Sequence, residues 1–341
     1  MSSFSLIRLL SCLLSCLPSR LPSRLFYLRR LSSLFGLCSL GCAPNFKRHS
    51  AARQPRSIAR WPNGSLALGR RLVTALLCLM PVFAAAAEPY RILVSNDDGI
   101  DSPLIHALSE GLATLPDVEV VVAAPDTNKS GSSQSTDGGP RTVREVSVDG
   151  QFYGYSVDGR PADAVRFGLL HLGKDAPFDL VVSGINRGAN VGDVSHLSGT
   201  VGAAMEAVMQ GVPAIAVSQD TSNVDTGVTV ALTKQLVTRY KDGSAPAGVV
   251  LSLNVPGGEL KGVAVRPMGE AYIASTPYTL SNRIGDMGTY ESSYAPQRAE
   301  DPASDTYAYQ NGYATLTPLK FDWTAHEMIE AVESWGITLR D

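Results

Sequence analysis

The segment RILVSNDDGIDSP, residues 91–103, determines the fold class of this chain. Its apolar start, residues 91–95, predicts a short buried strand, and its final proline opens an amphipathic stretch that predicts a helix over residues 103–115. Only the turn-forming sequence Asn96-Asp97-Asp98-Gly99 and three further residues separate the two elements. A strand that passes directly into a helix is typical of α/β proteins.

The same alternation continues through the rest of the chain. Further strands are predicted at residues 118–124, 180–183, 214–218 and 249–254, further helices at 162–172, 199–210 and 228–240, and a hairpin at 143–148 and 152–157. This order predicts an α/β core over residues 88–256, with a mostly parallel sheet and helices on both faces. Residues 257–341 are expected to form a β-rich C-terminal extension packed on that core.

Residues 1–87 differ sharply in composition from the rest. They hold twelve of the 29 basic residues, none of the 32 acidic ones and all five cysteines. Residues 69–87 combine two arginines, an apolar run and four alanines, which together indicate a cleaved secretory signal peptide rather than a retained anchor. We therefore expect an exported, periplasmic protein without membrane attachment or cysteine chemistry after cleavage. Residues 1–68 are interpreted as a disordered leader or a mis-assigned start, with lipid attachment at Cys42 as a further alternative.

The charge of the chain after the leader limits its partners. Seventeen basic residues remain there against all 32 acidic ones, a formal balance of −15. Polymeric nucleic acid is excluded as the main partner, because binding it requires a basic surface. A small phosphorylated substrate stays compatible with this charge if a divalent cation supplies local positive charge.

Polar side chains follow three of the predicted strands. Asp97 and Asp98 follow the first strand, Ser130 lies in the long polar loop after the second, and Asn186 follows the third. Because ligands of open α/β sheets bind at the carboxyl ends of the strands, these residues are candidate ligands of Mg²⁺ or Mn²⁺. Asn-Asp-Asp-Gly fits a helix-capping turn equally well, so the local sequence leaves both interpretations open.

The start of the helix at residues 199–210 is a candidate phosphate site. Ser198, Gly199 and Thr200 would present free backbone N–H groups there, although the same residue types also serve as ordinary helix caps. Asn96 and Asn190, in the strand-end loops, are further candidate substrate-binding residues. The chain has no G-x-x-x-x-G-K-[ST] loop and no strand followed by G-x-G-x-x-G, so the motifs of P-loop NTPases and dinucleotide oxidoreductases are missing.

Five segments in order resemble the SurE family of survival nucleotidases. They are RILVSNDDGIDSP (91–103), VVAAPDTNKSGSSQS (121–135), VDGRPADAV (157–165), DLVVSGINRGANVGDVSHLSGTVGAAMEA (179–207) and GYATLTPLKFDWT (312–324). The resemblance implies a Rossmann-like core, a C-terminal extension exchanged between the subunits of a homodimer or homotetramer, and phosphomonoesterase activity on 5′- and 3′-nucleotides. It also implies one divalent metal ion per subunit, bound by Asp97, Asp98, Ser130 and Asn186.

The chain departs from the family pattern at four positions. Thr127 and Lys129 stand where arginine is usual, Arg160 where threonine is usual, and Leu197 where tyrosine is usual. These departures concern contacts with the substrate rather than the expected metal ligands.

The expected reaction is hydrolysis of a nucleoside monophosphate or another small phosphomonoester. Asp97 or Asp98 would orient the attacking water, and the sequence does not choose between them. Two alternatives stay open: a phosphatase that forms an aspartyl-phosphate on Asp97, and a non-catalytic periplasmic protein that binds metal and phosphate.

The leader hypothesis makes a direct prediction about the mature protein. Because the signal features end at Ala87, N-terminal sequencing of protein isolated from its native host is expected to begin within a few residues of Glu88. A mature N-terminus near Met1 would contradict the export hypothesis.

Overall fold

The computed structural model describes residues 88–339. The segments interpreted as a leader, residues 1–68, and as a signal peptide, residues 69–87, lie outside the described residues. Within the described range no helix is both long enough and apolar enough to cross a membrane.

A nine-stranded sheet forms the centre of the described fold, with the strand order β3-β4-β2-β1-β5-β6-β7-β13-β8. Its strands are β1 (Tyr90–Ser95), β2 (Val118–Pro125), β3 (Val143–Val148), β4 (Gln151–Val157), β5 (Leu180–Arg187), β6 (Ala214–Gln219), β7 (Val250–Val255), β8 (Val263–Val265) and β13 (Ala314–Leu319). The strands from β4 to β7 are parallel, whereas β3 and β13 pair antiparallel to their neighbours β4 and β7. The predicted Rossmann-like, mostly parallel sheet is therefore confirmed.

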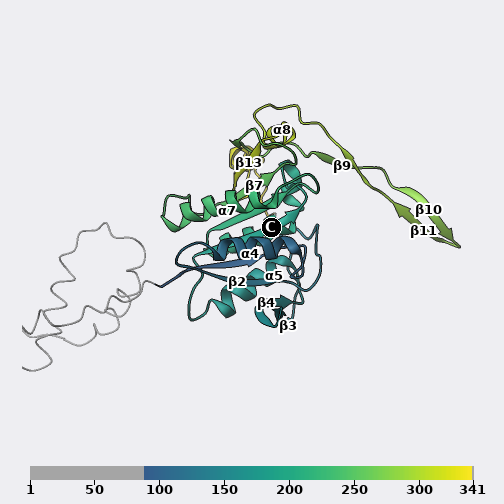
Figure 1. Cartoon of the computed structure of the whole chain (residues 1–341). Helices are drawn as coiled ribbons and strands as arrows, with labels where there is room; N and C mark the ends of the chain where they lie inside the picture. The colour runs from purple at the N-terminus through teal and green to yellow at the C-terminus, as the bar shows by residue number, and fades with distance from the viewer. Residues whose placement is uncertain (1–87, 340–341) are drawn as a thin grey trace, which may run out of the picture. The chain divides into compact units, whose positions relative to one another are not determined.

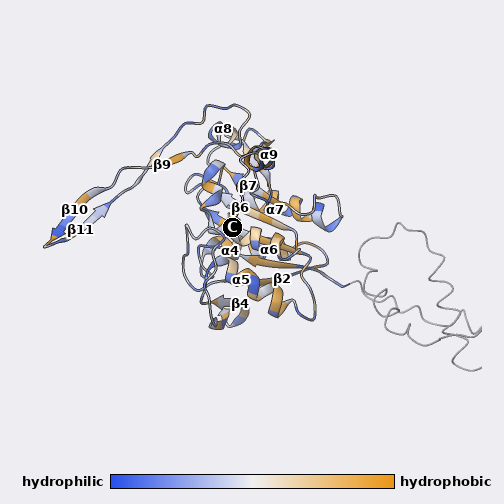
Figure 2. Cartoon of the chain, turned by 180° about the vertical axis from the view of Figure 1, so that it is seen from behind, coloured by the Kyte–Doolittle hydropathy of each residue, from blue (hydrophilic) through white to orange (hydrophobic). Residues whose placement is uncertain are grey.

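Helices cover both faces of the sheet. On one face α4 (Pro103–Ala113) lies beside α7 (Thr226–Lys241) (Figure 1). On the other face α5 (Pro161–Phe167) contacts α6 (Gly199–Met209) (Figure 2). Alternate residues of β1 divide between the two apolar cores: Ile92 and Val94 pack under α4 and α7, and Leu93 packs under α5 and α6. This two-sided burial explains why the central strands are continuous apolar runs, which Figure 2 shows as hydrophobic ribbons.

The position of β1 in the sheet determines where a ligand can bind. It pairs in parallel with β2 on one side and β5 on the other, so the strand order reverses at β1. At such a switch point the loops after neighbouring strands lead to opposite faces and leave a crevice. Asp97 and Asp98 directly follow β1 and so lie at this crevice.

The C-terminal region contributes both to the sheet and to a projecting arm. Strands β8 and β13 complete one edge of the sheet, and α8 (Asp305–Gln310) precedes β13. Between them an arm extends away from the sheet, built from the antiparallel pairs β9 (Ile273–Ser275) with β12 (Tyr294–Pro296) and β10 (Thr279–Ile284) with β11 (Met287–Glu291) (Figure 1). The short elements η4 (His326–Met328) and α9 (Ile329–Glu333) lie near the end of the chain.

Three local features differ from the sequence-based expectations. β5 continues to Arg187 rather than ending at Ser183, because it resumes pairing with β6 after an irregularity at residues 184–185. The helix expected over residues 162–172 divides into α5 and the π-helix η2 (Gly168–Leu172). The arm strands were expected only as unspecified β structure.

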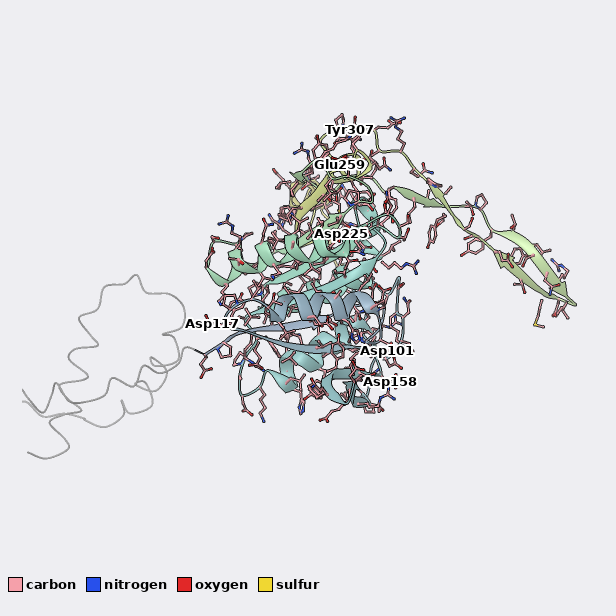
Figure 3. The ribbon with its side chains drawn as sticks, viewed as in Figure 1. Asp101, Asp117, Asp158, Asp225, Glu259 and Tyr307 are labelled. Carbon is pink, nitrogen blue, oxygen red and sulfur yellow. The ribbon has the colours of Figure 1, made fainter. Side chains whose placement is uncertain are left out.

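The acidic residues of the described chain are distributed over many elements. Asp101, Asp117, Asp158 and Glu259 are exposed and lie on separate parts of the fold (Figure 3). These exposed carboxylates contribute to the negative formal charge of the chain after residue 87.

Candidate functional site

The loop after β1 is held in a fixed shape by Asn96. Its side-chain Oδ1 accepts a hydrogen bond from the Gly99 backbone N–H at 3.2 Å, and its Nδ2 donates to the Gly99 carbonyl at 2.9 Å. Gly99 adopts a φ of +101°, which favours glycine. Asn96 is fully buried and both ends of its amide are used within the loop, so it shapes the turn that presents Asp97 and Asp98.

The carboxylate of Asp97 lies against the first turn of α6. The Thr200 hydroxyl donates to Asp97 Oδ1 at 2.5 Å, and the Thr200 backbone N–H also interacts with this carboxylate. Thr200 is fully buried, and its hydroxyl positions Asp97 in this structure. The expected contact of Thr200 with phosphate stays a prediction.

Burial raises the pKa of Asp97 to about 6, because desolvation disfavours the charged form. The hydrogen bond from Thr200 acts in the opposite direction, and the neighbouring Asp98 charge raises the pKa further. The side chain of Asp97 is only 2 % exposed. A bound cation would favour its ionised form.

Gly199 allows this close approach of helix and carboxylate. A Cβ atom at position 199 would lie 2.8 Å from Asp97 Cβ and 2.6 Å from Ser132 Oγ, both closer than side chains tolerate. The adjacent Ser198 caps α6 by accepting a hydrogen bond from the Val201 N–H at 3.2 Å. Ser198 is therefore a helix cap, as one of the two sequence-based interpretations expected, and it also borders the cavity described below.

Asp98 is oriented by two donors from different loops. Asn128 Nδ2 donates to its Oδ1 and the Arg187 backbone N–H donates to its Oδ2, each at 3.1 Å. Burial raises the pKa of Asp98, while the Arg187 N–H and charge lower it. Asp98 borders a second cavity, of about 550 Å³, that it shares with Arg187 and Gln219.

Ser130 comes from the polar loop after β2, which is attached to the site at both sides. The Lys129 N–H donates to the Asp97 carbonyl at 2.7 Å, and the Ser133 N–H donates to the Leu197 carbonyl at 3.1 Å. The Asn128 side chain supports the turn by accepting from the Ser130 N–H at 3.0 Å. These bonds explain how a long, Ser- and Gly-rich loop brings Ser130 to the end of β1.

Asn186 enters from the end of β5 with a defined orientation. Its Nδ2 donates to the Gly188 carbonyl at 2.7 Å, which leaves the amide oxygen as the atom without an assigned donor. Asn190, four residues on, is tied by its Nδ2 to Ser218 Oγ at 2.8 Å and by its backbone N–H to Asn254. Both residues are largely buried and both border the same cavity.

A cavity of about 460 Å³ brings these groups together. Three of the four expected metal ligands line it, namely Asp97, Ser130 and Asn186. The candidate substrate residues Ser198 and Asn190 also line it, whereas Asn96, Gly199 and Thr200 do not. A further wall, which was not predicted from the sequence, comes from the arm and the segment before it; its residues are Ala271, Tyr272, Ile273, Ser275 and Tyr294.

The residues that depart from the family pattern divide between this cavity and its surroundings. Leu197 is 58 % exposed and lines the cavity. Lys129 instead pairs with Asp126 at 3.1 Å, and Arg160 pairs with Asp137 at 2.8 Å and donates to Ser135 Oγ. Arg160 therefore stabilises the polar loop and makes no contact in the cavity.

Among residues 88–339 no group of three or more His, Cys, Asp or Glu side chains is arranged to hold a metal ion. Any cation at this site would therefore need neutral oxygen ligands beside the two carboxylates. The Ser130 hydroxyl and the Asn186 amide oxygen are suitable ligands for a hard cation.

Fold and site together define an α/β protein with a polar, two-carboxylate site at the switch point of its sheet, where small ligands bind in this class. Residues 92–275 match the family described as Survival protein SurE. The chain belongs to the SurE family, and the resemblance found in its sequence is confirmed.

Individual relatives agree with this assignment. The chain is 38 % identical to the 5′-nucleotidase SurE of Vibrio parahaemolyticus over 253 residues, which cover 73 % of this chain and 95 % of the relative. It is 36 % identical to the 5′-nucleotidase SurE of Vibrio cholerae over 249 residues, 72 % of this chain and 97 % of the relative. The crystal structure of the SurE protein from Aquifex aeolicus matches with a TM-score of 0.61 at 32 % identity, covering 72 % of this chain and all of that one.

The raised pKa of Asp97 predicts a stability cost that depends on pH. The native state holds the Asp97 proton more tightly than the unfolded state, so stability falls as pH rises from about 4 to about 6 and the cost is complete above that range. A difference of this size corresponds to roughly 3 kcal/mol. Asp97→Asn, which is uncharged, is expected to stabilise the metal-free protein at pH 7.5 and to have little effect at pH 4.

Denaturant unfolding of both proteins in a chelator, at the two pH values, measures this difference. Equal stabilisation at both pH values would contradict the electrostatic explanation, because a packing effect does not depend on ionisation of the carboxylate.

Proposed function

We propose that this chain is a divalent-metal-dependent phosphomonoesterase that hydrolyses nucleoside 5′- and 3′-monophosphates to nucleoside and phosphate. The observation that carries the proposal is the single cavity lined by Asp97, Ser130 and Asn186 at the switch point of the sheet. Its volume of about 460 Å³ lies in the range of small-molecule sites. Relatives named 5′-nucleotidase that align over nearly their whole length support the choice of substrate class.

One Mg²⁺ or Mn²⁺ ion per subunit is assigned to Asp97, Asp98, Ser130 and Asn186. The donor set supports this assignment, because the Asn186 Nδ2 is engaged and its oxygen is left for a ligand. The buried Asp97 carboxylate, whose pKa is raised, also favours a nearby cation. When bound, such a cation polarises a phosphoryl oxygen and lowers the pKa of a water molecule.

The protein groups around the cavity have separate tasks in this proposal. Asp97, fixed by Thr200, supplies a buried anionic ligand. Asp98 is less buried than Asp97, borders the neighbouring cavity of about 550 Å³ and is held by Arg187 and Asn128; we assign it the task of orienting the attacking water. Ser198 and Asn190 border the space for the phosphate and sugar.

A homodimer or homotetramer in the periplasm completes the proposal. The arm exposes large apolar side chains, Tyr278, Ile284 and Met287, at 66–73 % of their full accessibility. The C-terminal segment likewise exposes Trp335 and Ile337. Exposed apolar surface of this kind supports contacts with further subunits. Export rests on the sequence of residues 69–87 alone.

Phosphate release from a panel of phosphomonoesters tests the function. We expect 5′-AMP and 3′-AMP to be hydrolysed with Mg²⁺ or Mn²⁺ and not with a chelator. Asp97→Asn is expected to lower kcat/KM by about a hundredfold or more at saturating metal, since changes to residues that merely support metal ligands already cost 10–100-fold.

Two outcomes would overturn parts of this proposal. Metal-dependent binding of nucleotide without turnover would make the chain a non-catalytic binding protein. Full activity of Asp97→Asn at saturating metal would place the reaction elsewhere.

The role of Thr200 gives a separate prediction. Thr200→Val removes the hydroxyl that holds Asp97 while keeping the shape of the side chain, so kcat/KM is expected to fall about tenfold, equivalent to about 1.4 kcal/mol. Thr200→Ser keeps the hydroxyl and is expected to retain activity. Steady-state kinetics at fixed metal and pH compares the two variants, and an unchanged kcat/KM in Thr200→Val would show that the hydroxyl has no part in positioning Asp97.

A further inference from the structure

The cavity that contains Asp97 has an aromatic wall formed by the arm. Tyr294, at the start of β12, lines this cavity and is 65 % exposed. Within residues 88–339 its ring stacks on no other ring and its hydroxyl makes no hydrogen bond. Tyr272, by contrast, is fixed: its hydroxyl donates to the Ala189 carbonyl at 2.9 Å and its ring packs against Tyr309. Tyr294 is thus the aromatic ring of this wall that is free to receive a ligand.

The pairing of β9 with β12 directs this ring into the cavity. Tyr294 is paired with Ser275, and Ile273 lies two residues from Ser275 on the same strand. Side chains at paired positions and at alternate positions share one face of a two-stranded ribbon. Tyr294, Ser275 and Ile273 all line the cavity, so this face of the ribbon is the one turned toward Asp97.

We propose that Tyr294 stacks on the nucleobase of the substrate while Asp97 and its neighbours hold the phosphate, an inference that rests on the proposed function. An aromatic ring offers a flat apolar surface to any base, because every base has a π-face. Leu197, exposed on the same cavity, adds apolar surface beside the base. The contact therefore distinguishes nucleotides from phosphomonoesters without a base, and not one base from another.

A third cavity, the competing cavity, offers another location for the base. It has a volume of about 440 Å³ and is lined by Trp323 and His196, whose rings meet edge to face at 5.2 Å. It shares Ser198 with the first cavity, but Asp97, Ser130 and Asn186 do not line it. A nucleotide with its phosphate at Asp97 therefore reaches Tyr294 within a single cavity, and would have to pass Ser198 to reach Trp323.

Ribose 5-phosphate separates the base contact from the chemistry, because it carries the sugar and phosphate of AMP without the base. Tyr294→Ala is expected to lower kcat/KM for AMP by about tenfold or more, the size of effect found when the aromatic partner of a base is replaced by Ala. The same variant is expected to leave kcat/KM for ribose 5-phosphate unchanged. Tyr294→Phe, which keeps the ring, is expected to behave as wild type toward both substrates.

Two matched variants complete the experiment. Tyr290→Ala removes a similarly exposed tyrosine from β11 of the same arm, outside the cavity, and is expected to leave AMP hydrolysis unchanged. Trp323→Ala removes the aromatic ring of the competing cavity and is also expected to have no selective effect on AMP.

Each other outcome overturns the proposal in a distinct way. An equal loss with AMP and ribose 5-phosphate in Tyr294→Ala would give Tyr294 a role in the structure of the arm. A selective loss in Trp323→Ala would place the base in the competing cavity. An equal kcat/KM of the wild-type protein for ribose 5-phosphate and for AMP would overturn the nucleotide assignment and, with it, the base contact. A wild-type preference for AMP that persists in Tyr294→Ala would overturn the base contact alone.

Discussion

The site depends on one buried carboxylate, that of Asp97, held against the start of α6. Removing a carboxylate from water is costly, and the raised pKa expresses that cost. The Thr200 hydroxyl and backbone N–H offset part of it, and Gly199 is required because no side chain fits between helix and carboxylate. A cation that binds Asp97 would offset the rest of this desolvation cost. The arrangement therefore lowers the stability of the metal-free protein and at the same time provides a strong anionic ligand, a combination that is common at functional sites.

The order of strands explains why this carboxylate has suitable neighbours. With β2 on one side of β1 and β5 on the other, the loop that carries Ser130 and the end of β5 that carries Asn186 lie on the two sides of β1. Backbone bonds such as that from Lys129 to the Asp97 carbonyl then fix the flexible polar loop to the end of β1. The positions of the two neutral oxygen ligands thus follow from the sheet, and their orientation follows from local hydrogen bonds.

Sequence predicted the parts of the molecule that depend on local patterns. Central strands such as β1 and β6 are buried on both faces, so they could be recognised as apolar runs. Because the carboxyl ends of parallel strands meet at one edge of the sheet, Asp97, Ser130 and Asn186 could be grouped before the structure was known. The partner of the Thr200 hydroxyl could not be predicted, because a helix-start threonine has the same local sequence whether it faces a phosphate or a carboxylate 103 residues away. The extension of β5 to Arg187 was missed because Gly184 indicates a loop in sequence, whereas in the sheet it precedes renewed pairing with β6.

The cavity wall formed by the arm was the least predictable part, since Tyr294 lines the same cavity as Asp97 only through the fold of the whole C-terminal region. The two sides of the cavity are also built under different constraints. On the sheet side, buried residues such as Asn186 and Asp97 each have fixed hydrogen-bond partners, and a substitution there disturbs several contacts. On the arm side, Tyr294 and Ser275 are exposed on a two-stranded ribbon, where a substitution changes little besides the surface offered to a ligand. Changes in the group that is recognised can therefore arise on the arm without disturbing the carboxylates on which the chemistry depends.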